Sequence, residues 1–151
     1  MVLGTGSVVP MSATNCTFCS IVAGESNAEV VWENDHVLAF MDLLPMTDGH
    51  LLIVPKCHRR DLLDLEADDG HHLMRAAAAL GNALMRGMGA KGLNLLHNTG
   101  THADQSQFHF HFHLIPRYGN DRLLHPWERR WGNWPDIMEH AGRIRRGLQP
   151  D

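Results

Sequence analysis

Residues 108–115 of this chain read Phe-His-Phe-His-Phe-His-Leu-Ile. Strict alternation of two residue types predicts a β-strand, because successive side chains of a strand point to opposite faces. His109, His111 and His113 are therefore expected in a row on one face, while the phenylalanines enter the core from the other. Alternate residues on one face lie about 6.5–7 Å apart. That spacing is too long to force three imidazoles onto one ion, but it lets one ring react while its neighbours bind or orient.

Three interpretations of this histidine face are open. A solvent-facing strand face usually carries Thr, Lys or Glu, which disfavours a purely structural role. A metal site is the second, since histidine is the commonest metal ligand. The preceding loop, residues 98–107, carries Asn98, Gln105 and Ser106, whose amides and hydroxyl suit an anionic phosphate. Imidazole beside such donors favours the third interpretation, nucleophilic chemistry at phosphorus.

The segments around this strand predict an α+β fold. Helices are expected over Thr17–Glu25, Glu66–Met88 and Asp136–Gly147. Strands are expected over Glu29–Glu33, His36–Met41, His50–Pro55, Gly92–His97 and Phe108–Ile115, the last stopped by Pro116. Because the strands precede and follow one long helix instead of alternating with helices, we expect a mostly antiparallel five-stranded sheet with its helices on one face.

Composition narrows the class of protein. The chain has 151 residues, 44% of them hydrophobic and 20% charged, which is ordinary for one globular domain. A net charge of −4 argues against a sequence-wide grip on nucleic acid. No apolar run approaches the roughly 18–20 residues that a membrane-spanning helix needs. With no signal-peptide pattern, these features predict a cytoplasmic protein that binds neither nucleic acid nor membrane.

The cysteines suggest a metal. Three cysteines without a signal peptide do not predict a disulfide framework. Cys16 and Cys19 have the Cys-x-x-Cys spacing that zinc sites use. A thioredoxin-like redox pair is the usual alternative, but no βαβ pattern surrounds these residues; two free thiols in a short helix are another. Cys57 has no evident partner and is interpreted as an ordinary thiol.

Several segments together resemble one family. Residues 105–115 (Gln-Ser-Gln-Phe-His-Phe-His-Phe-His-Leu-Ile) resemble the signature of the histidine triad (HIT) family, His-x-His-x-His preceded by Gln-Ser or Gln-Thr. Residues 40–43 (Phe-Met-Asp-Leu) look like its ribose- and base-binding strand. Residues 48–58 (Asp-Gly-His-Leu-Leu-Ile-Val-Pro-Lys-Cys-His) resemble its Gly-His…Val-Pro-Lys-x-His segment, and Asn94 and Asn98 match its Asn-rich strand end. The similarity runs from about Cys16 to Tyr118 and leaves the tail uncovered.

The resemblance implies a HIT-like fold and a nucleotidyl hydrolase or transferase. His111, the middle histidine, would be the nucleophile that forms a covalent nucleotidyl-histidine. Ser106 would donate to the bridging atom or leaving group. His113 and the backbone of Gln105 and Ser106 would hold the non-bridging phosphate oxygens. No metal is needed for these steps, because positioning and charge stabilisation supply them.

The nucleotide-binding residues also follow from the resemblance. Asn98 would touch the phosphate, and Asp42 would accept hydrogen bonds from the ribose hydroxyls. Leu43 and Phe18 are candidates for the base pocket. We expect hydrolysis of nucleoside 5′-monophosphoramidates of the purine, AMP type. A dinucleoside polyphosphate hydrolase or phosphorylase, a nucleotide-binding regulatory module with little turnover, and a zinc-structured interaction protein remain alternatives.

In the bacterial members that this chain resembles, the cysteine pair is joined by two histidines, which correspond to His58 and His109 here. Two thiolates and two imidazoles form a closed tetrahedral site, so the implied role of Zn²⁺ is structural. Asp104 departs from the family, where many members carry Gly. An aspartate tolerates the left-handed conformation, but a carboxylate near phosphate is repulsive, so Asp104 either points away or selects the leaving group.

The resemblance also implies a homodimer that pairs the long helix and a sheet edge. The stretch Ala76–Ala79 would allow close helix approach, although tight packing on the sheet is the simpler interpretation. We expect residues 1–12 to be a disordered extension, 13–120 to form the HIT domain, and 121–151 to be a tail packing on the domain or on a dimer partner. Its tryptophans (Trp127, Trp131 and Trp134) would lie near the site or the dimer seam.

Overall fold

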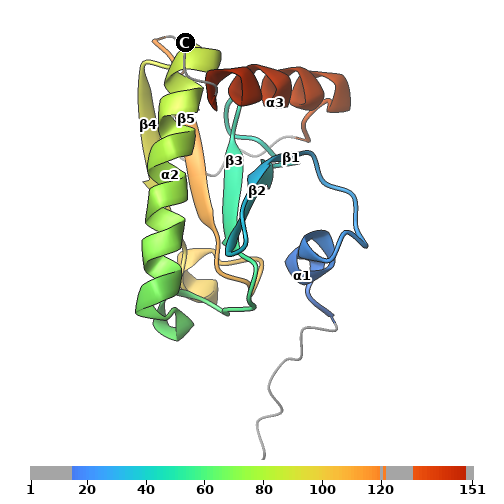
Figure 1. Ribbon diagram of the computed structural model, residues 1–151, viewed down its shortest axis with the longest axis vertical. Helices are drawn as coiled ribbons and strands as arrows, with labels where there is room; N and C mark the ends of the chain where they lie inside the picture. Colours follow the sequence, from blue (N-terminus) through green and yellow to red (C-terminus); the bar gives the residue numbers. More distant parts are fainter. Residues whose placement is uncertain (1–14, 120, 122–130, 149–151) are drawn as a thin grey trace, which may run out of the picture.

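The computed structural model describes residues 15–119, 121 and 131–148. Its elements are α1 (Thr17–Val22), β1 (Val30–Glu33), β2 (Val37–Met41), β3 (Leu51–Pro55), the 3-10 turn η2 (Leu62–Asp64), α2 (Ala67–Gly87), β4 (Gly92–Leu96), the 3-10 turn η3 (Thr101–Ala103), β5 (Phe112–Arg117) and α3 (Trp134–Leu148) (Figure 1). The strands form one sheet in the order β1-β2-β3-β5-β4, and each neighbouring pair is antiparallel. The predicted α+β class with a five-stranded antiparallel sheet is confirmed.

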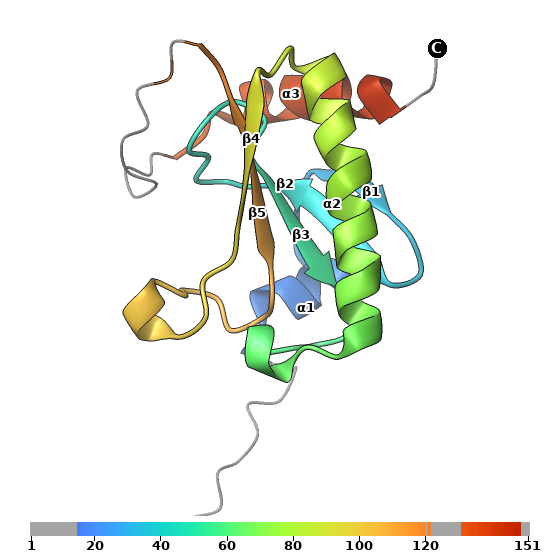
Figure 2. The same cartoon turned by 90° about the vertical axis from the view of Figure 1, so that its left-hand side faces the viewer.

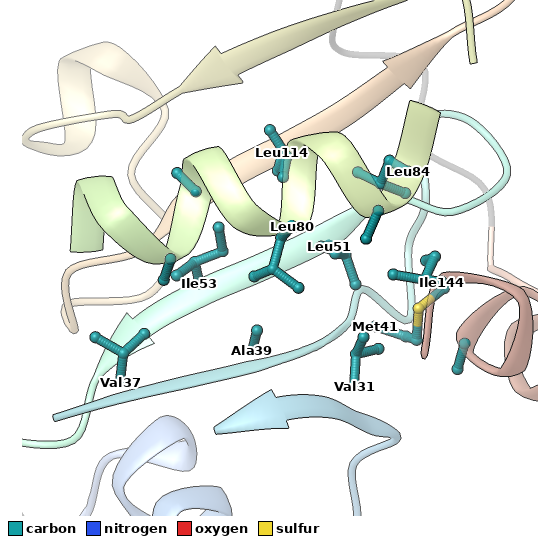
Figure 3. Close-up of a cluster of buried hydrophobic side chains, with 14 of the residues drawn as sticks. Val31, Val37, Ala39, Met41, Leu51, Ile53, Leu80, Leu84, Leu114 and Ile144 are labelled. Atoms are coloured by element: carbon teal, nitrogen blue, oxygen red, sulfur yellow. The ribbon is translucent and has the colours of Figure 1, made fainter. Parts of the chain in front are cut away.

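The long helix α2 packs its apolar stripe on one face of the sheet. Its start is fixed by a reciprocal capping box between Glu66 and Asp69. Leu73, Leu80 and Leu84 recur at helical spacing and are 0% exposed. They meet side chains of β2, β3 and β5 in the main core, which Figure 3 shows between the helix and the strands.

Helix α3 completes this core by crossing the C-terminal end of α2 (Figure 2). Ile137, Ala141 and Ile144 belong to the same buried cluster. Neither Gly87 nor Gly147 has room for a Cβ atom, because the backbone of the other helix occupies that space. The tail helix was predicted over Asp136–Gly147, and it extends a few residues beyond those limits.

The short helix α1 covers the opposite face, so the expectation that all helices lie on one face is wrong. Phe18 packs with Leu38, Phe40, Leu52 and Val54, which alternate with the residues that face α2. The physical reason is visible in β2 and β3, where every position is buried. A strand without polar positions needs cover on both faces.

Strand β5 differs from its predicted limits. It begins at Phe112 instead of Phe108, and it continues through Pro116 to Arg117. Pro116 pairs with Leu93 in β4, while β3 has ended its pairing at Leu51. On the side of β5 that faces β3, the Pro116 carbonyl accepts a hydrogen bond from Thr47 Oγ1 at 2.7 Å. The missing proline N–H therefore interrupts no ladder, and the prediction that Pro116 stops the strand is wrong.

The proposed N-terminal extension, residues 1–12, and Trp127 lie outside the described residues. Within the described part of the chain, no helix combines the length and the apolar character that crossing a bilayer requires.

Candidate active site and metal centre

A cavity of about 320 Å³ opens on the α1 side of the sheet. That volume lies at the lower end of the range for small-molecule pockets. Six of the residues predicted from the sequence line it: Phe18, Asp42, Leu43, Ser106, His111 and His113. They come from α1, the end of β2, the loop before β5, and β5 itself with the residues leading into it. The fold thus brings both ends of the predicted nucleotide site to one concave surface.

His111 is held as a neutral ring with a defined tautomer. Its Nδ1–H donates to the backbone carbonyl of His109 at 2.8 Å, which leaves the Nε2 lone pair unprotonated. Burial lowers the pKa of His111 to about 4, although this hydrogen bond opposes the shift. Phe18 packs edge-on against the ring, with centroids 5.3 Å apart. At neutral pH the ring therefore presents an unprotonated Nε2, which is the form of imidazole that can act as a base or as a nucleophile.

His109 has the complementary arrangement. Its Nε2–H donates to the Pro55 carbonyl at 2.9 Å, so the lone pair lies on Nδ1. Burial lowers the pKa of His109 to about 4. Its Nδ1 lies 3.4 Å from Cys16 Sγ and 3.5 Å from Cys19 Sγ. The first histidine of the strand thus turns away from the cavity and toward the cysteine pair.

Cys16, Cys19, His58 and His109 form one cluster, with every ligand atom within 4.8 Å of the others. The His58 Nδ1 to Cys19 Sγ distance is 3.3 Å. In a tetrahedral site with zinc–sulfur and zinc–nitrogen bonds of about 2.3 and 2.0–2.1 Å, a sulfur and a nitrogen ligand lie about 3.5 Å apart. The distances in the cluster match this value, so the residues fit a zinc ion.

The protonation chemistry of the cysteines also fits a cation. Burial, together with the hydrogen bond and the charge of the neighbouring Cys16, raises the pKa of Cys19 to about 11. A divalent ion removes this penalty, because thiolates coordinate it directly. Cys16 in addition caps α1, since its Sγ accepts from the Cys19 backbone N–H at 3.4 Å.

His113 is oriented by His50. His50 was not predicted as a site residue, although it belongs to the Gly-His…Val-Pro-Lys-x-His segment. The His50 Nδ1 accepts from the Met46 backbone N–H at 3.1 Å, so its proton lies on Nε2. That Nε2–H donates to His113 Nδ1 at 3.0 Å. His113 must then carry its own proton on Nε2. Asp42 Oδ2 lies 3.6 Å from His50 Nε2 and 3.9 Å from His113 Nδ1.

This hydrogen-bond order decides between two uses of the Asp42, His50 and His113 cluster, whose ligand atoms also lie within 4.8 Å of one another. A metal ion would need the Nε2 lone pair of His50, but the Met46 N–H holds the lone pair on Nδ1. The cluster is therefore a chain of hydrogen bonds that places the proton of His113 on Nε2.

The loop before the histidines is tied together by Gln105. Its Oε1 accepts from the Gly100 N–H at 2.7 Å, and its Nε2 donates to the Arg60 carbonyl at 2.7 Å. The side-chain amide of Gln105 is thus occupied by hydrogen bonds within the protein. Ser106 is exposed and lines the cavity. Asn98 is buried but does not line the cavity. Its contact with phosphate therefore stays a prediction.

Asp104 is the one non-glycine residue among the described residues with a positive φ, 61°. It adopts the left-handed conformation that Gly would adopt at this position in many family members, and that Asp tolerates. Its side chain is exposed and does not line the cavity. This is the arrangement expected if the carboxylate points away from a bound phosphate.

Two further residues of the site, His97 and Asn27, were not predicted. His97 donates from Nδ1 to the His111 carbonyl at 2.9 Å and stacks on Phe110 with centroids 4.2 Å apart. Asn27 and Trp131 line the cavity. The signal for His97 was its place at the end of a predicted strand that pairs with the histidine strand. For Trp131 the sequence indicated only a tail near the site or a dimer seam.

Comparison with known proteins agrees with this geometry. The HIT domain model matches residues 23–120. Protein hit of Bacillus subtilis is 40% identical over 107 residues, which cover 71% of this chain and 74% of the relative. Adenylylsulfatase HINT3 of Arabidopsis thaliana is 36% identical over 121 residues, 80% of this chain and 61% of the relative. The crystal structure of a Zn-bound histidine triad family protein from Mycobacterium smegmatis has a TM-score of 0.81 at 33% identity, covering 91% of this chain and 95% of that one.

Proposed function

This chain belongs to the histidine triad (HIT) family, and on that basis we propose that it is a nucleotide-binding hydrolase. The reaction is the cleavage of nucleoside 5′-monophosphoramidates of the purine, AMP type, through a nucleotidyl-histidine intermediate. The observation that carries the proposal is the His111 ring, which is neutral, fixed through Nδ1, and borders a cavity beside a second histidine and a serine.

The first step forms a bond between His111 Nε2 and the α-phosphorus. The bond from phosphorus to the leaving nitrogen breaks at the same time, and the departing amine takes up a proton from solvent water. The water that attacks in the second step returns one proton to solvent, so the protons balance. Ser106 at the rim donates a hydrogen bond to this leaving group, and His113 donates from Nε2 to a non-bridging oxygen. Fixed donors aimed at the phosphoryl oxygens stabilise the charge that develops in the transition state.

The second step is hydrolysis. Water attacks the phosphorus, the phosphorus–nitrogen bond to His111 breaks, and the nucleoside monophosphate leaves. The electron pair returns to Nε2, and the low pKa of His111 keeps the regenerated ring neutral. Asp42 binds the ribose hydroxyls, while Phe18 and Leu43 contact the base. Adenylylsulfatase HINT3 is a relative whose name denotes hydrolysis of an adenylyl compound, which supports this class of reaction.

The cluster of Cys16, Cys19, His58 and His109 is proposed to hold a structural Zn²⁺. These four residues would hold the ion in a closed site, where it would have a structural role and supply no catalytic step. Its ligands connect α1 to the nucleophile, because the His109 carbonyl is the acceptor that orients His111. The zinc-bound relative from Mycobacterium smegmatis supports a metal in this family.

A homodimer through β4 and α2 is also proposed. β4 is an edge strand, and its Leu93 and Leu95 are 36% and 41% exposed. On α2, Met74 and Met85 are exposed beside it, at 53% and 40%. An exposed apolar edge strand is normally covered. Light scattering of the wild-type protein and of Leu95→Glu tests this: a dimer that the substitution converts to monomer is expected, and a wild-type monomer contradicts the proposal.

The test of function is hydrolysis of a fluorogenic adenosine 5′-phosphoramidate and of a diadenosine polyphosphate. Wild type and His111→Ala are compared, with His102→Ala as the control, because His102 is an exposed histidine outside the cavity. Wild type should release AMP from the phosphoramidate, and His111→Ala should lose roughly 10⁴-fold or more in kcat. His102→Ala should match wild type.

The intermediate is tested separately. Rapid acid-free quenching followed by intact-mass measurement should show protein carrying one added AMP group in wild type and none in His111→Ala. Turnover of the diadenosine polyphosphate alone would favour the dinucleotide hydrolase. Nucleotide binding without turnover of either substrate would indicate a regulatory module, and full activity of His111→Ala would overturn the assigned nucleophile.

A further inference from the structure

Trp131 is a large aromatic side chain left in solvent at the mouth of the cavity. It is 78% exposed and lines the same cavity as His111. A tryptophan exposed to that degree leaves a large apolar surface uncovered. At the edge of a ligand pocket, such a surface suits a flat apolar group of the ligand.

The position of Trp131 is fixed by the next residue. The Gly132 N–H donates to the Leu43 carbonyl at 2.9 Å. A Cβ atom at Gly132 would lie 2.9 Å from Ile137 Cδ1 and 3.0 Å from Pro45 Cδ, which is tighter than most real Cβ contacts. A larger residue would therefore have to displace these side chains, and glycine lets the chain lie close to Pro45. This contact holds the indole beside Leu43, a wall of the cavity.

The two ends of the cavity differ in chemistry. His111, His113 and Ser106 form the polar end, where the phosphorus binds in the proposed function. The other end is apolar: Phe18 and Ile21 project from α1, and Leu43 is 42% exposed at the end of β2. Phe18 packs edge-on against Phe40 at 5.4 Å and against His111, and these contacts position its ring in the cavity wall. A nucleotide whose phosphorus meets His111 extends its base toward this apolar end.

We propose that Trp131 stacks on the base of the bound nucleotide and makes the site prefer purines over pyrimidines. The inference rests on the proposed nucleotide-binding function. Trp131 is a specificity-determining residue in it and takes no part in the chemical steps. Stacking gains with ring area, so the two-ring purine covers more of the indole than a pyrimidine does.

The experiment is calorimetric titration of AMP and of UMP into the full-length protein. Wild type is compared with Trp131→Ala and Trp131→Phe, and with Trp134→Ala as the matched control. Trp134 is 42% exposed three residues further on and does not line the cavity. Because Trp131 is mostly in solvent, its replacement should leave the melting temperature within about 2 °C of wild type.

Trp131→Ala should weaken AMP binding about tenfold and UMP binding less than about threefold, since loss of base stacking is worth this order of effect. The ratio of the two affinities should therefore move toward one. Trp131→Phe should recover most of the ratio because it keeps a flat ring, and Trp134→Ala should equal wild type. The same ratio should appear in KM for adenosine and uridine phosphoramidates.

Equal weakening of AMP and UMP, or no weakening of either, would overturn the role of Trp131, and so would failure of wild type to bind AMP. These results are separable from the proposed reaction. Wild type that hydrolyses phosphoramidates but shows an unchanged affinity ratio in Trp131→Ala contradicts only this inference. Wild type that binds purines through Trp131 without any turnover contradicts only the reaction.

Discussion

The two faces of the sheet are built in different ways. The face toward α2 and α3 is covered by 21- and 15-residue helices and buries an apolar cluster that includes Leu51, Leu80 and Leu84. The opposite face is covered by the six-residue α1, and four buried histidines lie behind it: His50, His109, His111 and His113.

This difference separates stability from chemistry. A six-residue helix is too short to be stable by itself in water. α1 is held by Phe18 and by its two cysteines, and the same helix forms a wall of the cavity. The α1 face therefore buries fewer apolar side chains than the α2 face, and it holds oriented histidine rings in their place. Perturbing each face in turn should give different results, and the predictions below run from the largest effect to the smallest.

Loss of the proposed zinc ion should have the largest effect on the α1 face. Cys19→Ala, or treatment with a strong chelator, should lower stability by about 3–5 kcal/mol and the melting temperature by roughly 10 °C or more. Thermal unfolding together with elemental analysis measures this. Cys57→Ala is the control, because that thiol lies outside the cluster. Protein purified without chelator that holds less than about a tenth of an equivalent of zinc would contradict the site.

On the helix face, truncation of a core side chain should reduce stability without changing the site. Leu80 is 0% exposed beneath α2, so Leu80→Ala should cost about 3 kcal/mol through lost burial and a cavity. Urea denaturation measures the loss, and AMP affinity should stay at the wild-type value. Arg75→Ala, at an exposed position of the same helix, should cost less than about 0.5 kcal/mol. A Leu80→Ala protein that loses AMP affinity would show that the two faces are coupled.

Acid should weaken the histidine face. The pKa of His111 falls from its ordinary 6.5 to about 4 on folding, so between these values the unfolded chain binds more protons than the folded one. Stability is fully present above pH 6.5 and decreases as the pH falls toward 4, by on the order of 3 kcal/mol for this ring. Denaturation curves at several pH values should show a shallower dependence in His111→Asn. Equal slopes in the two proteins would rule out the buried ring as the cause.

Within the histidine face, His50 should matter for catalysis more than for binding. His50→Phe keeps the ring volume but removes the Nε2–H that fixes the tautomer of His113. We expect kcat to fall about 100-fold, in the range of general acid–base contributions, with AMP affinity within about threefold of wild type. Steady-state kinetics and calorimetry measure the two quantities, with His102→Ala as control. A fall in affinity equal to the fall in kcat would contradict a role in tautomer selection.

The smallest effect is expected at Asp104, which holds φ at 61° in the exposed loop. Asp104→Gly should raise stability by about 0.5 kcal/mol because glycine adopts this conformation without strain, whereas Asp104→Ala should lower it. The ratio of amine to phosphate leaving groups should stay constant, since the side chain lies outside the cavity. A changed ratio in Asp104→Gly would restore the idea that this carboxylate selects the leaving group.

Much of the fold followed from local pattern. The alternation at Phe108–Ile115 predicted which side chains share a face, and the 3.6-residue spacing predicted α2 within one residue at each end. The family resemblance supplied the four residues of the metal cluster, and the structure brings their ligand atoms within 4.8 Å of one another. The shared face and the helix limits could be predicted because periodicity is a property of the chain itself, while zinc binding by the cluster stays a prediction.

The tertiary structure decided what depends on the path between elements. Nothing local to Pro116 shows that β3 has already ended beside it, so the strand continues where the residue type predicted a stop. The side of the sheet that α1 covers depends on the loop from α1 into β1. The tautomer of His113 depends on Met46 and His50, and Trp131 reaches the cavity because Gly132 packs on Pro45. Such contacts join residues far apart in sequence, and they exist only once the chain has folded.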